Sequence, residues 1–437
     1  MIASLLLTTL FCILIFFSYK RGVIITAMTL QLLSFLGTGI PGVKIFFSLS
    51  IFALLLLFPR LKYLSRKPYG KWLTRASLLF LLSFGITLSF THFSHWDKVL
   101  INYIAYFIFP FILWKCLDSK QSVQFAIKTL AIFMSVAVVY GVFEAFSRSN
   151  PVFELLEKVF IMEDFTINTN AVRFGLKRCN SFFAYNSTYA IACFASLFVF
   201  YAEYFLLRQK NRWHIALMFL CVFGTLSTGS RAVFPAMGIT LLFLFSSKRF
   251  MSTKAGVLFF VTMIVFIPLV TAILYQMIDS MVNSNTSEYA RGSSLKMRMW
   301  QWKICYPYFM DSPIVGNGRM FIWDVVKKAH WKLLGAESIW FSILVDYGLL
   351  GASAFLYLIY ACARHLKRFN SRLVCLPIGY LLILSLSPDT GITYNVLISF
   401  TVLIIRMFQF LNKNDYEPKV QCYNPDIQYK RLPCQMH

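Results

Sequence analysis

The sequence predicts an all-α polytopic membrane protein, and three observations support that fold class. First, 58% of the 437 residues are hydrophobic and only 14% are charged. Second, the apolar residues form long runs, many close to the length of about 20 residues that a helix needs to cross a bilayer. Third, the basic residues gather in the loops between those runs. A soluble domain of this size would not need so much apolar surface, whereas a membrane bundle presents it to lipid.

The apolar runs, taken in order, predict about 11–13 transmembrane helices, a range that reflects several short runs. The first run follows no basic segment and ends in no small-residue cleavage pattern, so we expect a retained helix rather than a signal peptide. The runs lie at residues 2–17, 22–40, 43–58, 76–93, 98–116, 124–146, 182–206, 214–228, 231–246, 255–277, 338–362, 372–387 and 391–411.

The charge of the loops orients these helices. Loops rich in Lys and Arg alternate with loops poor in them, and the positive-inside rule makes the basic loops cytoplasmic. The same placement accounts for the formal net charge of +24 without nucleic acid as a partner. The basic loops are 60–75, 208–212, 248–254 and 364–372, and the loops poor in basic residues are 93–98, 228–231 and 388–391.

This orientation puts two long segments, 147–181 and 278–337, on the external side. Long connections are where function tends to concentrate. The alternation also puts the N-terminus outside, and two alternatives stay open there: run 2–17 lies at the interface, or the count of runs is off. The predicted organisation is an N-terminal transmembrane bundle (1–277, with loop 147–181), an external loop (278–337), C-terminal transmembrane helices (338–411) and a polar cytoplasmic tail (412–437).

The ten cysteines are scattered, mostly in or beside apolar runs, as expected for small core residues. Cys179 and Cys305 both fall in external segments, so a disulfide between them is an open possibility. No CxxC or HExxH pattern occurs. The sequence therefore predicts neither a metal nor a cofactor.

Cations recur in the external segments. Arg173, Lys177 and Arg178 precede the helix start NSFFAYNSTYA, where a ligand role and a solvated loop with a polar cap are both open. Arg231 lies in the short turn of LSTGSRAVFPA. Turn N–H groups and a guanidinium together suit phosphate, and the alternative is an arginine that snorkels to a lipid headgroup.

A third cluster contains Arg291, Lys296, Arg298 and Lys303. Arg298 and Trp302 have i,i+4 spacing, so on a helix they share one face. The alternative is an amphipathic helix on the membrane surface, with its tryptophans as interfacial anchors and its basic residues on anionic lipid.

Glu337 is an acid just before a long apolar helix, at an external surface lined with cations. A carboxylate at the first turn of a helix interacts favourably with the helix dipole. The neighbouring arginines would also keep it ionised, as a general base requires. Both interpretations stay open.

These clusters, in this order, resemble the O-antigen ligase and O-antigen polymerase (Wzy-type) family. LSTGSRAVF is similar to the family's Ser-Arg element, and Arg298, Trp302 and the stretch Asp311–Gly318 resemble its R-x-x-x-W and P-x-x-G-x-G motifs. ESIWFSILVDYGLLG resembles its His-Asn-x-x-x-Leu helix ending in G-x-x-G, with Gly348 and Gly351 in register. The stretch RCNSFFAYNSTYA is a looser match. The resemblance covers the chain from Arg178 to Gly351.

The resemblance implies a glycosyltransferase of the bacterial inner membrane that acts on its periplasmic face without a metal. The donor would be an oligosaccharide on undecaprenyl pyrophosphate, and a chain-length regulator protein is an implied partner beside membrane lipid. Glu337 would be the general base, with Arg231 and Arg298 also catalytic. Further substrate-binding residues would be Arg291, Arg178, Arg173 and Trp302.

The acceptor separates two versions of this activity. Ligases of the family carry a histidine where this chain has Glu337, which favours a polymerase of repeat units over a ligase that uses lipid A–core. A transporter is the non-enzymatic alternative. It would place ionisable residues at mid-depth in the bundle, whereas the charges here collect near helix ends.

Overall fold

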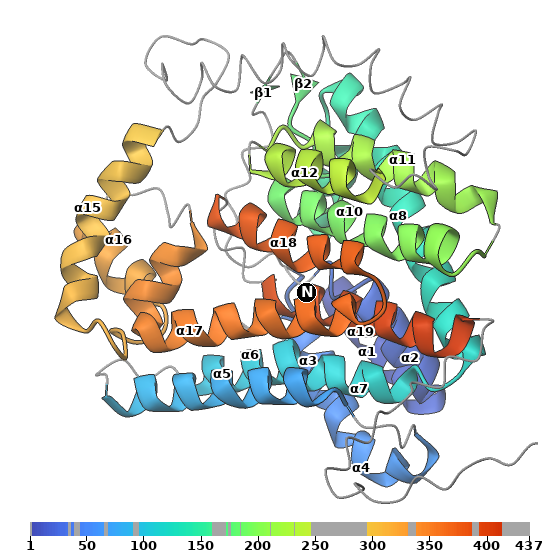
Figure 1. The fold of residues 1–437 in the computed structure, drawn as a ribbon, viewed down its shortest axis with the longest axis horizontal. Helices are drawn as coiled ribbons and strands as arrows, with labels where there is room; N and C mark the ends of the chain where they lie inside the picture. The colour runs from blue at the N-terminus through green and yellow to red at the C-terminus, as the bar shows by residue number, and fades with distance from the viewer. Residues whose placement is uncertain are drawn as a thin grey trace, which may run out of the picture.

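The computed structural model confirms the all-α class (Figure 1). β-structure among the described residues is confined to the hairpin β1 (Val172–Arg173) and β2 (Leu176–Lys177) and one isolated bridge. The structure describes residues 2–33, 36–38, 44–64, 69–90, 96–159, 172–173, 176–183, 185–209, 211–230, 232–245, 295–330, 338–386 and 393–412.

Helices in the N-terminal half are α1 (Ile2–Phe17), α2 (Tyr19–Met28), α3 (Ile45–Leu55), α4 (Leu57–Arg60), η1 (Leu61–Tyr63), α5 (Lys71–Phe90), α6 (Trp96–Tyr103), η2 (Ile104–Ile108), α7 (Phe109–Cys116), α8 (Lys120–Ser147) and α9 (Pro151–Val159). Those that follow are α10 (Asn186–Tyr201), η3 (Ala202–Leu206), α11 (Arg212–Ser227), α12 (Val233–Phe245), α15 (Leu295–Asp311), η4 (Ile322–Val326), α16 (Lys327–Ala329), α17 (Ile339–Lys367), η5 (Ser371–Val374), α18 (Cys375–Ser385) and α19 (Thr393–Leu411).

Six stretches of the described chain are long and apolar enough to cross a membrane. They are Lys71–Ser89, Val99–Cys116, Lys120–Ser147, Asn186–Leu206, Ile339–Lys367 and Tyr394–Leu411, and five shorter apolar helices of 10–17 residues accompany them. Run 255–277 and nearly all of the tail 412–437 lie outside the described residues. The number of crossings stays a prediction.

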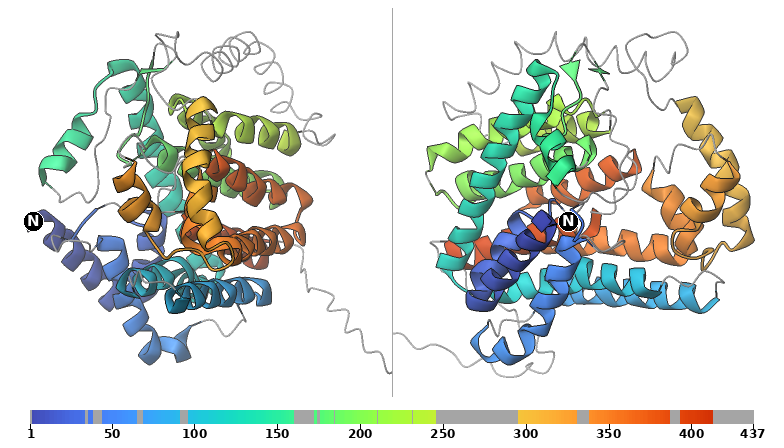
Figure 2. Two further views of the ribbon diagram at one scale, coloured as in Figure 1. Left: turned by 90° about the vertical axis from the view of Figure 1, so that its left-hand side faces the viewer. Right: turned by 180° about the vertical axis from the view of Figure 1, so that it is seen from behind.

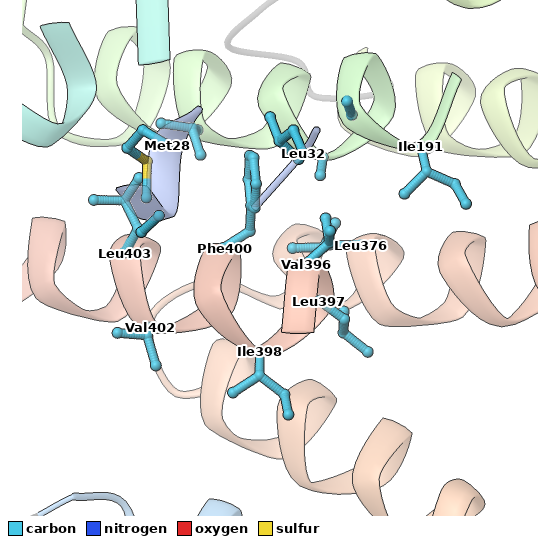
Figure 3. Packing of buried hydrophobic residues seen from close by; sticks show 14 of the residues in the cluster. Met28, Leu32, Ile191, Leu376, Val396, Leu397, Ile398, Phe400, Val402 and Leu403 are labelled. Atoms are coloured by element: carbon cyan, nitrogen blue, oxygen red, sulfur yellow. The ribbon is translucent and has the colours of Figure 1, made fainter. Parts of the chain in front are cut away.

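The core is built around α10 and α19. Every residue of α10 from Ser187 to Tyr201 is buried, and α19 is buried along most of its length. Figure 3 shows Ile191 of α10 on the side of Leu376 of α18 and Val396 of α19, while Phe400 of α19 points toward Leu32. A helix that is apolar on all sides belongs in such a central position.

The helix pair α5 and α17 runs antiparallel along one side of the bundle (Figure 1). At one end Gly70 abuts the ring of His365, and further along Gly351 lies beside Ser83. At the other end the Thr87 hydroxyl donates to the Val315 carbonyl at 2.7 Å.

The bundle has a basic end, where the helix termini carry Lys20, Lys120, Arg212, Arg364, Lys367 and Arg368. Contacts at that end join Lys20 to Asp118, Gln209 to the Leu411 carbonyl (3.4 Å) and the ring of Phe369 to that of Phe408. The opposite end contains the segments 177–183, 227–230, 312–320 and 338–341 and the last turn of α18.

Helices α10 and α18 link the two halves of the opposite end. They run antiparallel: Arg372 interacts with Tyr201, and Gly379 abuts the ring of Phe194. The same spacing brings Leu386, after α18, level with the start of α10. The described segments that contain candidate site residues therefore all lie at one end of the bundle.

Candidate functional site

Helix α17 is interrupted at Gly348, where the backbone turns to φ 63°, ψ −161°. The interruption frees carbonyl and N–H groups that a continuous helix would pair internally. The turn 312–320 forms hydrogen bonds with these carbonyl and N–H groups. Asn317 N–H donates to Val345 (2.9 Å), Gly318 N–H to Asp346 (2.9 Å), Leu349 N–H to Pro313 (2.8 Å) and Leu350 N–H to Ile314 (3.0 Å).

Glycine is required on both sides of this junction. A Cβ at Gly348 would lie 2.5 Å from the Ile314 carbonyl oxygen, and one at Gly316 would overlap the Asp346 carbonyl. Both glycines also have positive φ, a region that L side chains rarely adopt. The P-x-x-G-x-G and G-x-x-G motifs thus bind each other through their backbones.

Asp346 locks the turn from the α17 side. Its carboxylate accepts hydrogen bonds from the N–H groups of Met320 and Ile322, each at 3.0 Å, at the start of η4. The Asn317 side chain adds a bridge by donating to the Tyr308 carbonyl at 2.6 Å. The turn, α15 and α17 therefore form one hydrogen-bonded unit.

Arg298 and Trp302 lie on one face of α15, as their spacing predicts. Arg298 Nη2 donates to the Leu386 carbonyl at 2.9 Å, at the end of α18. The Trp302 ring lies 4.6 Å from that of Phe341 in the first turn of α17. Figure 2 shows α15 crossing the end of α17 at one edge of the molecule. The two side chains thus lie where the ends of α17 and α18 meet.

The start of α17 is fixed at this junction. Ser338 caps the helix by accepting from Trp340 N–H at 3.3 Å, and the Trp340 indole donates to Ser385 Oγ at 2.9 Å. Trp300 packs on the small buried cluster around Cys305 and Phe341. Trp300 therefore packs against protein, while Trp302 is 41% exposed.

The other half of the opposite end is held by Glu144, which is fully buried near the end of α8. It pairs with Lys177 at 3.3 Å and accepts from the N–H groups of Asn180 (3.1 Å) and Ser181 (2.7 Å). This places Arg178 beside the turn after α11, where its Nε donates to the Thr228 carbonyl at 3.4 Å. Lys177 is thus a structural partner of Glu144 rather than a solvated charge.

Comparison with known families bears on this arrangement. Residues 213–356 match the family model described as O-Antigen ligase. The match begins in α11, ends in α17, and includes the turn 227–230, α15 and the turn 312–320 with its partner Gly348. We refer to residues 213–356 as the O-antigen ligase domain, after the family model that they match. The resemblance inferred from the motifs is confirmed. No curated protein matches the chain.

The structure describes part of the predicted site. Within the O-antigen ligase domain it places Arg298 and Trp302 together, and before the domain it places Arg178 at the turn that leads to Arg231. Arg173 lies on β1, of which the backbone alone is described. Arg231, Arg291 and Glu337 lie outside the described residues. Ser230, next to Arg231 in the chain, and Ser338, next to Glu337, both lie at the opposite end.

The possible disulfide between Cys179 and Cys305 does not form, because both cysteines are free and buried. Burial raises the pKa of each thiol to about 12. Both therefore remain protonated at neutral pH, a state unsuited to metal binding or nucleophilic attack. Within the described residues, no three or more His, Cys, Asp or Glu side chains are grouped to hold a metal ion.

Three residues of this end were missed from sequence: Glu144, Arg319 and Asp346. Asp346 did carry a signal, as an acid inside the apolar stretch SILVDYGLLG. Arg319 followed the glycine turn directly, but its position depends on how that turn packs. The partner of Glu144 could not be read from the sequence, because the pairing depends on the tertiary fold.

Proposed function

We propose that this protein polymerises lipid-linked oligosaccharide repeat units of an O-antigen or capsular polysaccharide at the periplasmic face of the bacterial inner membrane. The supporting observation is the position of Arg298. It lies within the O-antigen ligase domain, at the junction of α15, α17 and α18, and at the end of the bundle opposite to the basic termini. A guanidinium so placed suits a phosphate that arrives with its lipid in the membrane.

The proposed reaction is an inverting glycosyl transfer. Glu337 takes the proton from a sugar hydroxyl of the acceptor, whose oxygen attacks the anomeric carbon of the donor. The bond between that carbon and the undecaprenyl pyrophosphate oxygen breaks, and the pyrophosphate leaves with the bonding electrons. Arg231 and Arg298, assisted by Arg291, stabilise the charge on the leaving group.

Arg178, Arg173 and Trp302 act in substrate binding under this proposal. Arg178 lies next to the turn that leads to Arg231. The exposed ring of Trp302 is a surface on which a sugar can pack.

The alternative acceptor is lipid A–core, which would make the protein an O-antigen ligase. Glu337, where ligases carry a histidine, favours the polymerase. A transporter is supported less well, because the buried Glu144–Lys177 pair lies at the end of α8 and is satisfied by structural contacts.

The deciding experiment is elongation of purified lipid-linked repeat unit by the purified protein, with a chelator present. We expect polymer in the presence of chelator, and a rate loss of about 100-fold or more for Arg298→Gln, the cost typical of removing one preorganised donor. Glu337→Gln and Arg231→Gln should lose activity too. Arg364→Gln, at the basic end, is the matched control and should elongate normally. Full-length polymer from Arg298→Gln or Glu337→Gln would contradict the assigned roles.

Cellular phenotype separates the two acceptors. Loss of a polymerase leaves single repeat units on the core, whereas loss of a ligase leaves polymer on its lipid carrier. A deletion strain that accumulates carrier-linked polymer would overturn the polymerase assignment in favour of the ligase.

A further inference from the structure

Arg319 is a cation of the opposite end to which the proposed transfer reaction assigns no role. Its backbone is fixed on both sides by Asp346. Gly318 N–H donates to the Asp346 carbonyl (2.9 Å), and Met320 N–H donates to the Asp346 carboxylate (3.0 Å). The turn 312–320 therefore presents Arg319 to α17 from a rigid backbone.

The guanidinium of Arg319 uses few of its donors. A guanidinium has five N–H groups. Nη1 of Arg319 donates to the Tyr347 hydroxyl at 3.3 Å. Its Nε is shielded from solvent and makes no hydrogen bond with a described residue.

No carboxylate in the described chain lies within ion-pair distance of Arg319. The charge of Asp346 acts on it, but the Asp346 carboxylate oxygens accept from backbone N–H groups of Met320 and Ile322. Lys177 is the instructive contrast, since its buried charge is paired with Glu144. A partly buried cation that has no counter-ion among the described residues favours the binding of an anion.

The partner hydroxyl of Arg319 is also held in place. The Tyr347 ring lies 4.7 Å from that of Phe84 on α5 and fills the space that a side chain at Gly351 would need. Arg319 is thus oriented before any ligand binds, which lowers the entropy cost of binding.

We propose that Arg319 forms an anion subsite for the diphosphate of a second lipid-linked substrate, separate from the site at Arg298. The proposal rests on the proposed polymerase function. A guanidinium matches phosphate through two parallel hydrogen bonds. Phe341, beside Trp302, and Tyr347 are six residues apart on α17, a rise of about 9 Å. Two diphosphate sites are what a polymerase requires, because its donor and its acceptor are both carrier-linked.

The test is the stoichiometry of undecaprenyl diphosphate bound to the purified full-length protein. We expect two molecules per chain for the wild type and one for Arg319→Gln, with at least about a tenfold weaker affinity at the lost site, as for hydrogen bonds to charged groups. Arg319→Lys should lose affinity as well, because an ammonium does not reproduce the bidentate geometry. Undecaprenol, which has no phosphate, should bind the wild type and Arg319→Gln equally.

Two control variants test specificity. Arg364→Gln removes an arginine that donates to a tyrosine, Tyr360, at the basic end, and it should still bind two diphosphates. Tyr347→Phe removes the hydrogen bond that orients Arg319 but keeps its charge, so it should still bind two diphosphates, with a smaller loss of affinity than Arg319→Gln. Two diphosphates on Arg319→Gln, or an equal loss in Tyr347→Phe, would overturn the subsite.

Photolabelling of the wild type needs no variant. A polyprenyl diphosphate with a photoreactive group should label the peptide that spans residues 312–330, and no label there would overturn the subsite even if Arg319→Gln fails to fold. The two proposals fail differently. If the wild type elongates and Arg319→Gln still binds two diphosphates, only the subsite proposal is contradicted. If the wild type binds two diphosphates but does not elongate, the polymerase proposal is contradicted.

Discussion

Glu144 shows how a buried charge can serve structure. Taking a carboxylate and an ammonium out of water costs several kcal/mol each, about what a close, fully hydrogen-bonded pair regains. One carboxylate oxygen of Glu144 accepts from the N–H groups of Asn180 and Ser181, and the other lies 3.3 Å from the Lys177 ammonium. The result is a fixed path for the chain that carries Arg178 to the turn after α11.

Replacing Glu144 by Gln should therefore destabilise the protein by about 3–5 kcal/mol, because Lys177 would stay buried without its counter-ion. The measurement is the thermal-unfolding midpoint of the purified protein in detergent. Asp118→Asn is the matched control. Its partner Lys20 is 41% exposed, so the loss should be about 1 kcal/mol or less. Equal midpoints for the two variants would contradict the structural role of Glu144.

Cys179 and Cys305 should resist alkylation at neutral pH. The thiolate is the reactive form, and with a pKa of about 12 its fraction rises only in strong alkali. Mass spectrometry after iodoacetamide treatment should find both unmodified until the protein is unfolded. The partly exposed Cys375 serves as the internal reference. A cross-linked peptide that contains both Cys179 and Cys305 would contradict the free thiols.

At the scale of elements, α17 and the turn 312–320 act as one part. Helix α17 has to break for its carbonyls to become available, and the turn has to approach closely enough to use them. Gly348 and Gly316 satisfy both needs. The same unit positions Arg319 and, through α15, Arg298.

Gly348→Ala should displace this unit. A non-glycine residue at φ 63°, ψ −161° costs about 1–3 kcal/mol, because this region is open essentially to glycine alone, and the added Cβ would also lie 2.5 Å from the Ile314 carbonyl. We expect at least about a tenfold loss of elongation rate, equivalent to 1.4 kcal/mol. Gly85→Ala on α5, where nothing lies within 4 Å of the added Cβ, should keep full activity. Normal elongation by Gly348→Ala would show that the junction is not needed.

The sequence was sufficient to predict some of these relations and insufficient for others. Hydropathy predicted most of the described helices, although run 22–40 is helical only as far as Met28. The i,i+4 spacing predicted the shared face of Arg298 and Trp302. Both predictions depend on local geometry. The backbone hydrogen bonds between the turn 312–320 and α17 could not be predicted, since hydrophobic periodicity does not show that α17 breaks at Gly348. The role of Arg319 was missed for the same reason, as it exists only once that junction has formed.

At the scale of the whole molecule, the contacts between helix termini divide the bundle into two ends. The loop pattern predicted this division, and the contacts place the basic helix termini together at one end and the segments with Arg178, Arg298 and Arg319 at the other. The positive-inside rule then assigns a compartment to each end. It follows that the whole orientation can be tested with one residue from each end.

Ser149, after α8, and Ser371, at the start of η5, suit that test because both are exposed and lie at opposite ends of the bundle. Each would be changed to Cys and treated with a membrane-impermeant maleimide in cells whose outer membrane has been permeabilised. We expect Ser149→Cys to be labelled directly and Ser371→Cys to be labelled only after lysis, because the basic end should face the cytoplasm. The wild type, with its own cysteines, gives the background. The reverse pattern would put Arg298 in the cytoplasm, on the side where a periplasmic glycan could not reach it, and the proposed polymerase would fail with the orientation.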